Sequence, residues 1–319
     1  MNICLVNDFH SKNSPGGAEI IAETLARELA DLGNQVSLIT FDSLDSVEDQ
    51  HGVKQYTVSC RYERFSSIYN REVAVKVRQV LKVVRPEIVH FHNIHNAFGY
   101  GIVRVVDELD IVSIFTAHDS MALVGGKLDR FRVSRSSGLP NVDYTIPWWF
   151  RLKRWASSSD YRRSLVSRRL LGLCQGRYAV SHALASAFSI NGMPGFEVVR
   201  NGIDDPVAGL GNSSDGEDSC KRESVKFLLA GRLNRHKGLH AALKAFRYAC
   251  ERSSAVKLVL VCPNKLDLRT DYNLPDFVCD RITKHGWLSQ NEMRAVYRSV
   301  DAVIVPSVYL DPFPTMNLE

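Results

Sequence analysis

One segment of the chain carries residues suited to holding an anionic ligand. It joins an apolar run, residues 227–230, to Gly231, Arg232, Lys237 and Gly238, and a helix-forming stretch follows. A strand that ends in glycine and leads into a helix points several backbone N–H groups at one spot, where the helix dipole also favours negative charge. An arginine fork and a lysine point charge suit a diphosphate better than a single carboxylate. A solvated loop with two incidental basic residues is the alternative.

Three further places add candidate ligand contacts. Gly16 and Gly17 follow the first apolar run and allow a backbone to approach a phosphate closely, although a turn and a helix start explain them equally well. His118 follows the apolar run 111–115. Because ligands of an open parallel sheet lie beyond the carboxyl ends of its strands, this ring is placed to reach a ligand, although a lone histidine is more often a satisfied structural group. The chain closes with a pair of carboxylates, Asp311 and Glu319.

Strand and helix patterns alternate along the chain, which predicts an α/β fold with parallel sheets. The predicted strands are 3–7, 36–41, 88–91, 111–115, 178–180, 225–230, 257–261 and 302–305, and the predicted helices are 18–32, 73–84, 183–188, 239–252 and 290–299. Residues 204–224 are rich in Gly, Ser and Asp and predict a linker or exposed loop. We therefore expect an N-terminal domain over 1–203 and a second domain over 225–319.

Composition favours a cytoplasmic enzyme over a membrane or secreted protein. The chain has 319 residues, 45% of them hydrophobic and 24% charged, which is enough for two cores. It contains no run of eighteen or more uncharged apolar residues, and it enters a strand at once instead of a signal-like segment. The seven cysteines form no Cys-x-x-Cys pair, so we expect buried reduced thiols.

Three histidines close together raise the alternative of a zinc site. His90 and His92 share one face of a strand by alternation, and His95 follows them. Apart from Glu87, no cysteine or carboxylate nearby completes a ligand set. We therefore predict no metal.

A basic segment, residues 127–169, stands out by charge. Its eleven basic residues against three acidic ones give a net charge of +8, more than the +5 of the whole chain, and Trp148, Trp149, Phe150 and Trp155 are interleaved. Such a segment can lie at an anionic membrane surface and meet a lipid-linked acceptor. An acceptor-glycan pocket and a solvated basic helix with its aromatic residues in the core are the alternatives. Nucleic acid is not expected as a partner, because no nucleic-acid module is present.

Taken together, the motifs resemble those of retaining glycosyltransferases of the GT-B fold, family-4 type. The segment Gly-Arg-Leu-x-x-x-Lys-Gly at 231–238, followed by two carboxylates eight positions apart, is similar to the donor site of that family. Further matches follow the family order, namely Gly16-Gly17-Ala18-Glu19, His90-Phe91-His92, Thr116-Ala117-His118-Asp119, Val180-Ser181 and Asn201-Gly202-Ile203-Asp204. The resemblance spans nearly the whole chain.

The resemblance implies two Rossmann-like domains that face a cleft, and a nucleotide diphosphate-sugar that is a substrate, with no cofactor. It implies that Gly16, Gly17, Arg232 and Lys237 contact the donor phosphates and that His118 contacts the transferred sugar. It places Asp311 near the sugar hydroxyls and Glu319 at the nucleotide ribose. Polysaccharide, lipid-linked and small-molecule acceptors are all compatible with it.

Two departures from the family pattern qualify these expectations. Asp311 stands where the family usually has glutamate, so its contact is shifted or changed. The chain ends at Glu319, so we expect an incomplete second domain and weak or absent transfer. A truncated, non-catalytic remnant that binds nucleotide or a partner is the main alternative. A sugar-nucleotide epimerase of the same fold would need acid and base carboxylates that we do not identify.

Overall fold

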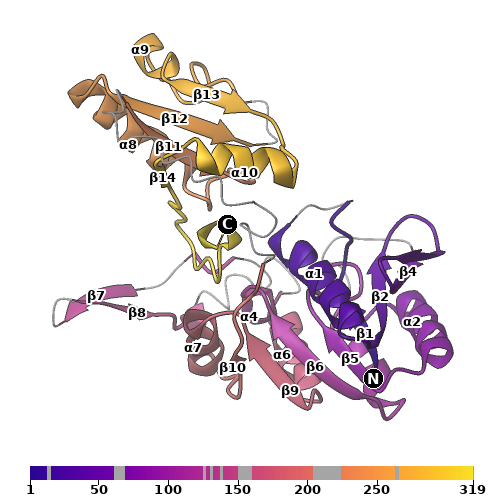
Figure 1. The fold of residues 1–319 in the computed structure, drawn as a ribbon. Coiled ribbons are helices and arrows are strands. Elements are labelled where there is room, and N and C mark those ends of the chain that lie inside the picture. Colours follow the sequence, from indigo (N-terminus) through magenta and orange to yellow (C-terminus); the bar gives the residue numbers. More distant parts are fainter. Residues whose placement is uncertain are drawn as a thin grey trace. The chain divides into compact units, whose positions relative to one another are not determined.

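The computed structural model describes residues 1–12, 16–60, 69–124, 127–129, 132–136, 139–149, 160–203, 224–262 and 266–318. The chain divides into two compact units, Met1–Gly202 and Ile203–Glu319 (Figure 1). The predicted linker lies outside the described residues except for its last position, and so does Glu319.

The first unit is built on an eight-stranded sheet in the order β10-β9-β6-β5-β1-β2-β4-β3. The strands are β1 (Asn2–Val6), β2 (Gln35–Phe41), β3 (Ser46–Gln50), β4 (Val53–Val58), β5 (Ile88–Phe91), β6 (Val112–Ala117), β9 (Gly176–Ala179) and β10 (Glu197–Val198). All neighbours pair in parallel except β3, which is antiparallel to β4 at the edge of the sheet.

The strand order reverses at β1. The chain first builds outward from β1 through β2 and β4, and then returns to place β5 and β6 on the other side of β1. In open parallel sheets, ligands bind outside the carboxyl ends of the strands at such a switch point. The loops that follow β1 and β5 are therefore the expected ligand-binding edge of this unit.

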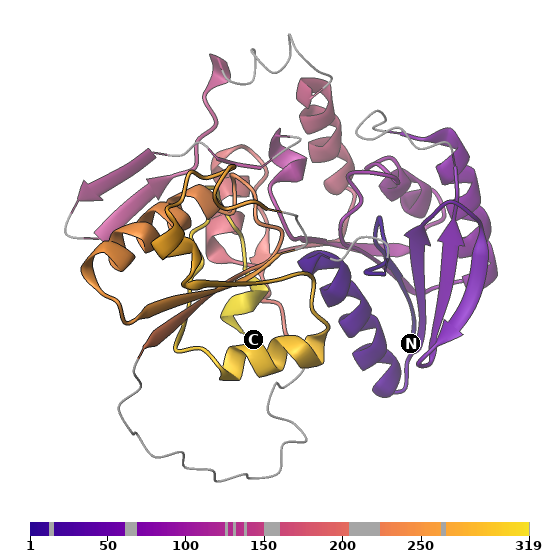
Figure 2. The same ribbon diagram turned by 90° about the horizontal axis from the view of Figure 1, so that it is seen from above.

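Helices cover both faces of this sheet. They are α1 (Gly17–Asp31), α2 (Arg71–Val84), α3 (Ile102–Asp107), α4 (Met121–Val124), α6 (Asp160–Leu171) and α7 (His182–Ile190). Leu25 and Leu29 of α1 pack on Ile3 and Leu5 of β1, and Figure 2 shows α1 and α2 on opposite sides of the strands. A separate antiparallel hairpin, β7 (Arg132–Ser136) and β8 (Leu139–Asp143), lies in the basic segment.

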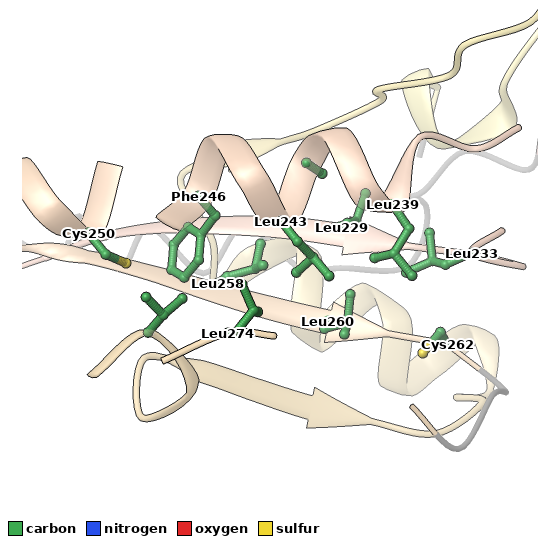
Figure 3. Close-up of a cluster of buried hydrophobic side chains, with 12 residues drawn as sticks. Leu229, Leu233, Leu239, Leu243, Phe246, Cys250, Leu258, Leu260, Cys262 and Leu274 are labelled. Atoms are coloured by element: carbon green, nitrogen blue, oxygen red, sulfur yellow. The ribbon is translucent and has the colours of Figure 1, made fainter. Parts of the chain in front are cut away.

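The second unit has a four-stranded parallel sheet in the order β13-β12-β11-β14. Its elements are β11 (Val225–Ala230), α8 (Leu239–Arg252), β12 (Val256–Val261), α9 (Asp276–Cys279), β13 (Ile282–His285), α10 (Gln290–Arg298), β14 (Ala302–Val303) and the 3₁₀ turn η1 (Thr315–Asn317). Leu243 and Phe246 of α8 pack against Leu258 and Leu260 of β12 (Figure 3). This apolar contact holds α8 against the sheet.

The predicted α/β class with parallel sheets is confirmed in both units. Within the described ranges, no helix has the length and apolar character needed to cross a membrane. Among the described cysteines, Cys4, Cys174, Cys250 and Cys262 are buried, and burial raises the pKa of Cys4 to about 12 and that of Cys174 to about 11.

Candidate functional site

Histidine side chains from two neighbouring strands meet at the carboxyl edge of the first sheet. β5 and β6 pair in parallel, with Phe91 opposite Phe115, and His92 and His118 each come directly after one of these strands. His92 Nδ1 lies 2.9 Å from His118 Nε2, and the ring centroids are 5.2 Å apart. The His90 ring lies against the His92 ring with centroids 4.1 Å apart and planes tilted by 34°, and its Nε2 lies 2.8 Å from Thr116 Oγ1. The parallel register thus gathers three imidazoles in one row.

All three rings are held in the neutral form. Burial, and then the nearby His118, lowers the pKa of His90 to about 3. Burial likewise keeps the pKa of His92 well below its ordinary value. For His118, burial and His95 outweigh the opposing charge of Asp119 and lower the pKa to about 4. A neutral imidazole offers one N–H donor and one acceptor nitrogen.

Asp119 is the charged neighbour of this row. Its carboxylate accepts the N–H of Met121 at 2.9 Å and lies 3.5 Å from Lys127 Nζ. Burial pushes the pKa of Asp119 upward, but His95, Lys127 and the Met121 hydrogen bond hold it below the ordinary value. The carboxylate is therefore ionised beside His118.

A second buried carboxylate, Asp8, shapes the loop after β5. It lies just beyond the end of β1 and accepts three backbone N–H groups, from Asn96 at 2.7 Å, Ala97 at 3.0 Å and Phe98 at 2.9 Å. These bonds join the loop after β1 to the loop that carries His92 and His95. Asp8 was absent from the predicted site, although its place directly after the first strand was a usable signal.

The glycine pair lies at the start of α1. Gly16 is the N-cap in extended conformation, with φ −141° and ψ 159°, and Gly17 is the first helical residue. As glycine, Gly16 offers no side chain to the first-turn N–H groups, which suits an outside anion. Its role as a phosphate contact stays a prediction.

The predicted zinc alternative gains no support from this geometry. The His92 and His118 nitrogens face one another at hydrogen-bond distance. Over the part of the chain that the structure describes, no three His, Cys, Asp or Glu side chains are grouped as a metal ion requires.

The second unit places its predicted residues on the turn from β11 to α8. Gly231 has φ +116° and Gly238 has φ +74°, both in the region that favours glycine. A Cβ at Gly238 would lie 1.9 Å from the carbonyl oxygen of Pro306, so only glycine permits this approach of α8 to the loop after β14. The same two segments are joined by the hydrogen bond from Val308 N to His236 O, 2.8 Å.

Lys237 and Asp311 come together in this unit. Lys237 Nζ lies 2.7 Å from Asp311 Oδ2, and the Ser307 hydroxyl donates to the same oxygen at 2.7 Å. Lys237 also lies 5.6 Å from the centre of the Tyr309 ring. Burial raises the pKa of Asp311, but the bonds from Lys237 and Ser307 outweigh it and hold the pKa below its ordinary value. The pair is therefore ionic, with the carboxylate orienting the lysine.

The other two predicted residues of this unit differ in status. Arg232 is exposed at the same turn, with its side chain accessible to a ligand. Glu319 lies outside the described residues. Ser307 and Tyr309, which surround Asp311, were not predicted, and no motif pointed to them.

Comparisons with known proteins identify the family. Residues 15–206 match Glycosyltransferase Family 4, and residues 217–319 match Glycosyl transferases group 1. The chain belongs to glycosyltransferase family 4. An uncharacterized glycosyltransferase of Methanocaldococcus jannaschii is 21% identical over 100% of this chain and 77% of the relative.

Solved structures show the same fold at low identity. Sucrose-phosphate synthase from Thermosynechococcus elongatus superposes with a TM-score of 0.60 at 16% identity, covering 99% of this chain and 78% of that chain. Anabaena HepE, in complex with UDP and glucose, gives 0.61 at 16% identity over 99% and 77%. Starch synthase IV from Arabidopsis thaliana, bound to ADP and acarbose, gives 0.60 at 15% identity over 96% and 78%. The fold of this glycosyltransferase is therefore GT-B, with two Rossmann-like domains.

The family match also bears on enzyme class. Both halves of the chain match glycosyltransferase families, which makes this protein a transferase. The alternative of a non-catalytic remnant is not favoured.

Proposed function

We propose that this glycosyltransferase moves a sugar from a nucleoside diphosphate donor to a glycan, lipid-linked or small-molecule acceptor, with retention of the anomeric configuration. The observation that carries the donor assignment is the β11–α8 turn, where Lys237 is held 2.7 Å from Asp311 beside the exposed Arg232. The proposal invokes no cofactor, because the nucleotide-sugar is a substrate.

The chemistry asked of these residues is stabilisation of a leaving diphosphate. Negative charge grows on the phosphate oxygens as the bond to the sugar breaks, and preorganised cations and helix N-termini lower the energy of that state. An ammonium carries three N–H donors. Lys237 can therefore keep its bond to Asp311 while it donates to a phosphate oxygen, and Arg232 can offer its fork to two more.

Two solved relatives support the ligand class. HepE was solved with UDP and glucose, and starch synthase IV with ADP and acarbose. Both carry a nucleoside diphosphate together with a sugar. We infer the same pair of ligand classes for this chain, with His118 at the sugar and Gly16 and Gly17 near the phosphates.

Calorimetry with UDP, GDP and ADP tests the donor assignment. Arg232→Ala and Lys237→Ala should each weaken the best of these ligands by about 1.5–3 kcal/mol, the range of a hydrogen bond to a charged group. Lys244→Ala is the matched control, because Lys244 is an exposed cation of α8 away from the turn. Unchanged affinity in both test variants would contradict the assignment of Arg232 and Lys237 to diphosphate binding.

The acceptor side is proposed from the basic segment. Trp148 is 73% exposed and Trp149 is 47% exposed, which disagrees with the alternative that places these two aromatic residues in the core. Phe150 and Trp155 lie outside the described residues. Exposed tryptophans among basic residues suit the headgroup level of an anionic membrane. We propose a cytoplasmic protein that contacts the membrane peripherally, where it meets its acceptor.

A further inference from the structure

The inner end of the histidine row contains a nitrogen without a hydrogen bond. His92 is 1% exposed, and its Nδ1 lies 2.9 Å from His118 Nε2. Its other nitrogen, Nε2, is buried and has no hydrogen-bond partner among the residues that the structure describes. Buried polar atoms are nearly always paired, so an unpaired one at the expected ligand-binding edge of the sheet calls for an explanation.

Only two proton arrangements are open to this pair of neutral rings. In the first, His92 Nδ1–H donates to His118 Nε2, and the unpaired His92 Nε2 is a bare acceptor. In the second, His118 Nε2–H donates to His92 Nδ1, and the unpaired His92 Nε2 carries a buried N–H. An orphaned buried N–H is rarer than an under-satisfied acceptor, so the first arrangement is favoured.

We propose that His92 is a positioning residue that fixes His118 as the tautomer protonated at Nδ1. His118 then serves as a hydrogen-bond donor through Nδ1, which suits a sugar hydroxyl or a phosphate oxygen. His90 supports the arrangement, because its ring lies against that of His92, with centroids 4.1 Å apart, and is itself anchored to Thr116. The part of this inference that concerns catalysis rests on the proposed function.

Because His92 Nε2 is unpaired, substitution of His92 should affect stability and activity differently. A buried polar atom that lacks a partner destabilises the folded state, so loss of His92 Nε2 is favourable, whereas loss of the His92 donor leaves His118 Nε2 unpaired and offsets that gain. His92→Phe keeps an aromatic ring in the stack but removes the donor to His118. We therefore expect a melting temperature close to that of the native protein, together with a fall in kcat of about a hundredfold, the size expected when a site group is misplaced. A merely structural histidine would lose stability and activity together.

Nitrogen-15 NMR of the histidine rings in the full chain tests the tautomer directly, with His118→Gln to assign the signals. The native protein should show His118 protonated at Nδ1, and His92→Phe should lose that preference. His92→Asn returns an amide N–H near the position of Nδ1, so it should restore the tautomer and most of kcat. Thr40→Val is the matched control. Thr40 Oγ1 is another buried atom without a partner in the described residues, so its removal should preserve stability and leave the His118 tautomer unchanged.

The outcomes separate this inference from the proposed function. His118 protonated at Nε2 in the native spectrum overturns the inference, and that measurement needs no variant and no turnover. A His92→Phe protein with native kcat on the best substrate of a panel of UDP-, GDP- and ADP-sugars also overturns it. An Nδ1–H tautomer in a protein that binds none of UDP, GDP and ADP in calorimetry supports the positioning role and counts against the proposed donor class.

Discussion

At the scale of single residues, the two predicted donor-site motifs contact one another through Lys237 and Asp311. Lys237 and Asp311 are 74 positions apart, and the sequence identified each of them without indicating that they contact one another. That contact depends on the loop after β14 reaching the start of α8, which no local pattern reports. An aspartate at position 311 fits this geometry, since its carboxylate oxygen lies 2.7 Å from both Lys237 Nζ and Ser307 Oγ.

The histidine row shows the same limit of sequence reasoning. The sequence identified His118 from its place after a predicted strand, whereas His90 and His92, which share one face of a strand, were considered with His95 as possible metal ligands. Parallel pairing of β5 with β6 instead directs His92 at His118. Long-range register of this kind cannot be read from a single sequence.

The neutral histidines should make the protein sensitive to acid. The folded pKa values of His90 and His118 are lowered to about 3 and about 4 from 6.5, so the unfolded chain takes up protons first as the pH falls. Stability is therefore full above about pH 6.5 and declines as the pH falls toward the folded values. Each proton taken up on unfolding contributes about 1.4 kcal/mol per pH unit to the free energy of unfolding.

Urea unfolding between pH 7 and pH 4.5 measures this decline. His95 and Asp119 face His118, Lys127 faces Asp119, and Asp119 remains ionised over this range because its pKa is lowered. His90→Phe should lower the slope of the free energy of unfolding against pH, because one proton fewer is taken up on unfolding. A free energy of unfolding that stays constant from pH 7 to pH 5 would contradict the neutral row.

At the scale of elements, apolar runs and helical periodicity located the cores. β5, β11 and α8 have the bounds that the sequence predicted, because each is a continuous apolar run or a strongly amphipathic segment. The hairpin of β3 and β4 was missed. β3 is a mostly exposed polar strand at the sheet edge, and its only local signal was the turn at His51 and Gly52, both with positive φ.

Replacement of Gly238 should disrupt the joint between α8 and the loop after β14. Gly238→Ala meets two penalties, a positive φ of 74° and a Cβ 1.9 Å from the Pro306 carbonyl oxygen. The left-handed backbone alone costs about 1–2 kcal/mol for a residue with a Cβ, and the clash adds to it. We expect a lower denaturation midpoint. We also expect weaker binding of UDP, GDP or ADP, because Lys237 is the residue next to Gly238 and would be displaced with it.

Gly286→Ala is the matched control for that substitution. Gly286 lies in the same unit, and an added Cβ there meets nothing within 4 Å. It should leave both the midpoint and the nucleotide affinity close to native. Equal effects of the two substitutions would mean that the close approach at Gly238 is not what holds the turn.

At the scale of the whole molecule, charge is unevenly distributed along the chain. Residues 127–169 carry +8 against +5 for all 319 residues, so the rest of the chain is slightly acidic. Each basic residue near an anionic surface contributes about 1 kcal/mol of attraction, and this attraction is screened within about 8 Å at physiological ionic strength. The exposed tryptophans of the segment add apolar contact that salt does not screen.

The chain should therefore sediment with anionic phospholipid vesicles at low salt and be released at high salt. Trp148→Ala and Trp149→Ala combined should lower the bound fraction at a given salt concentration, because both side chains are exposed within the basic segment. Trp287→Ala is the control, since Trp287 is 50% exposed but belongs to the second unit. Vesicles of phosphatidylcholine alone should recover little protein. Equal recovery on neutral and anionic vesicles would contradict the membrane role. It would favour the tryptophans as a glycan-binding surface, which a titration with an acceptor glycan, followed by tryptophan fluorescence, would detect.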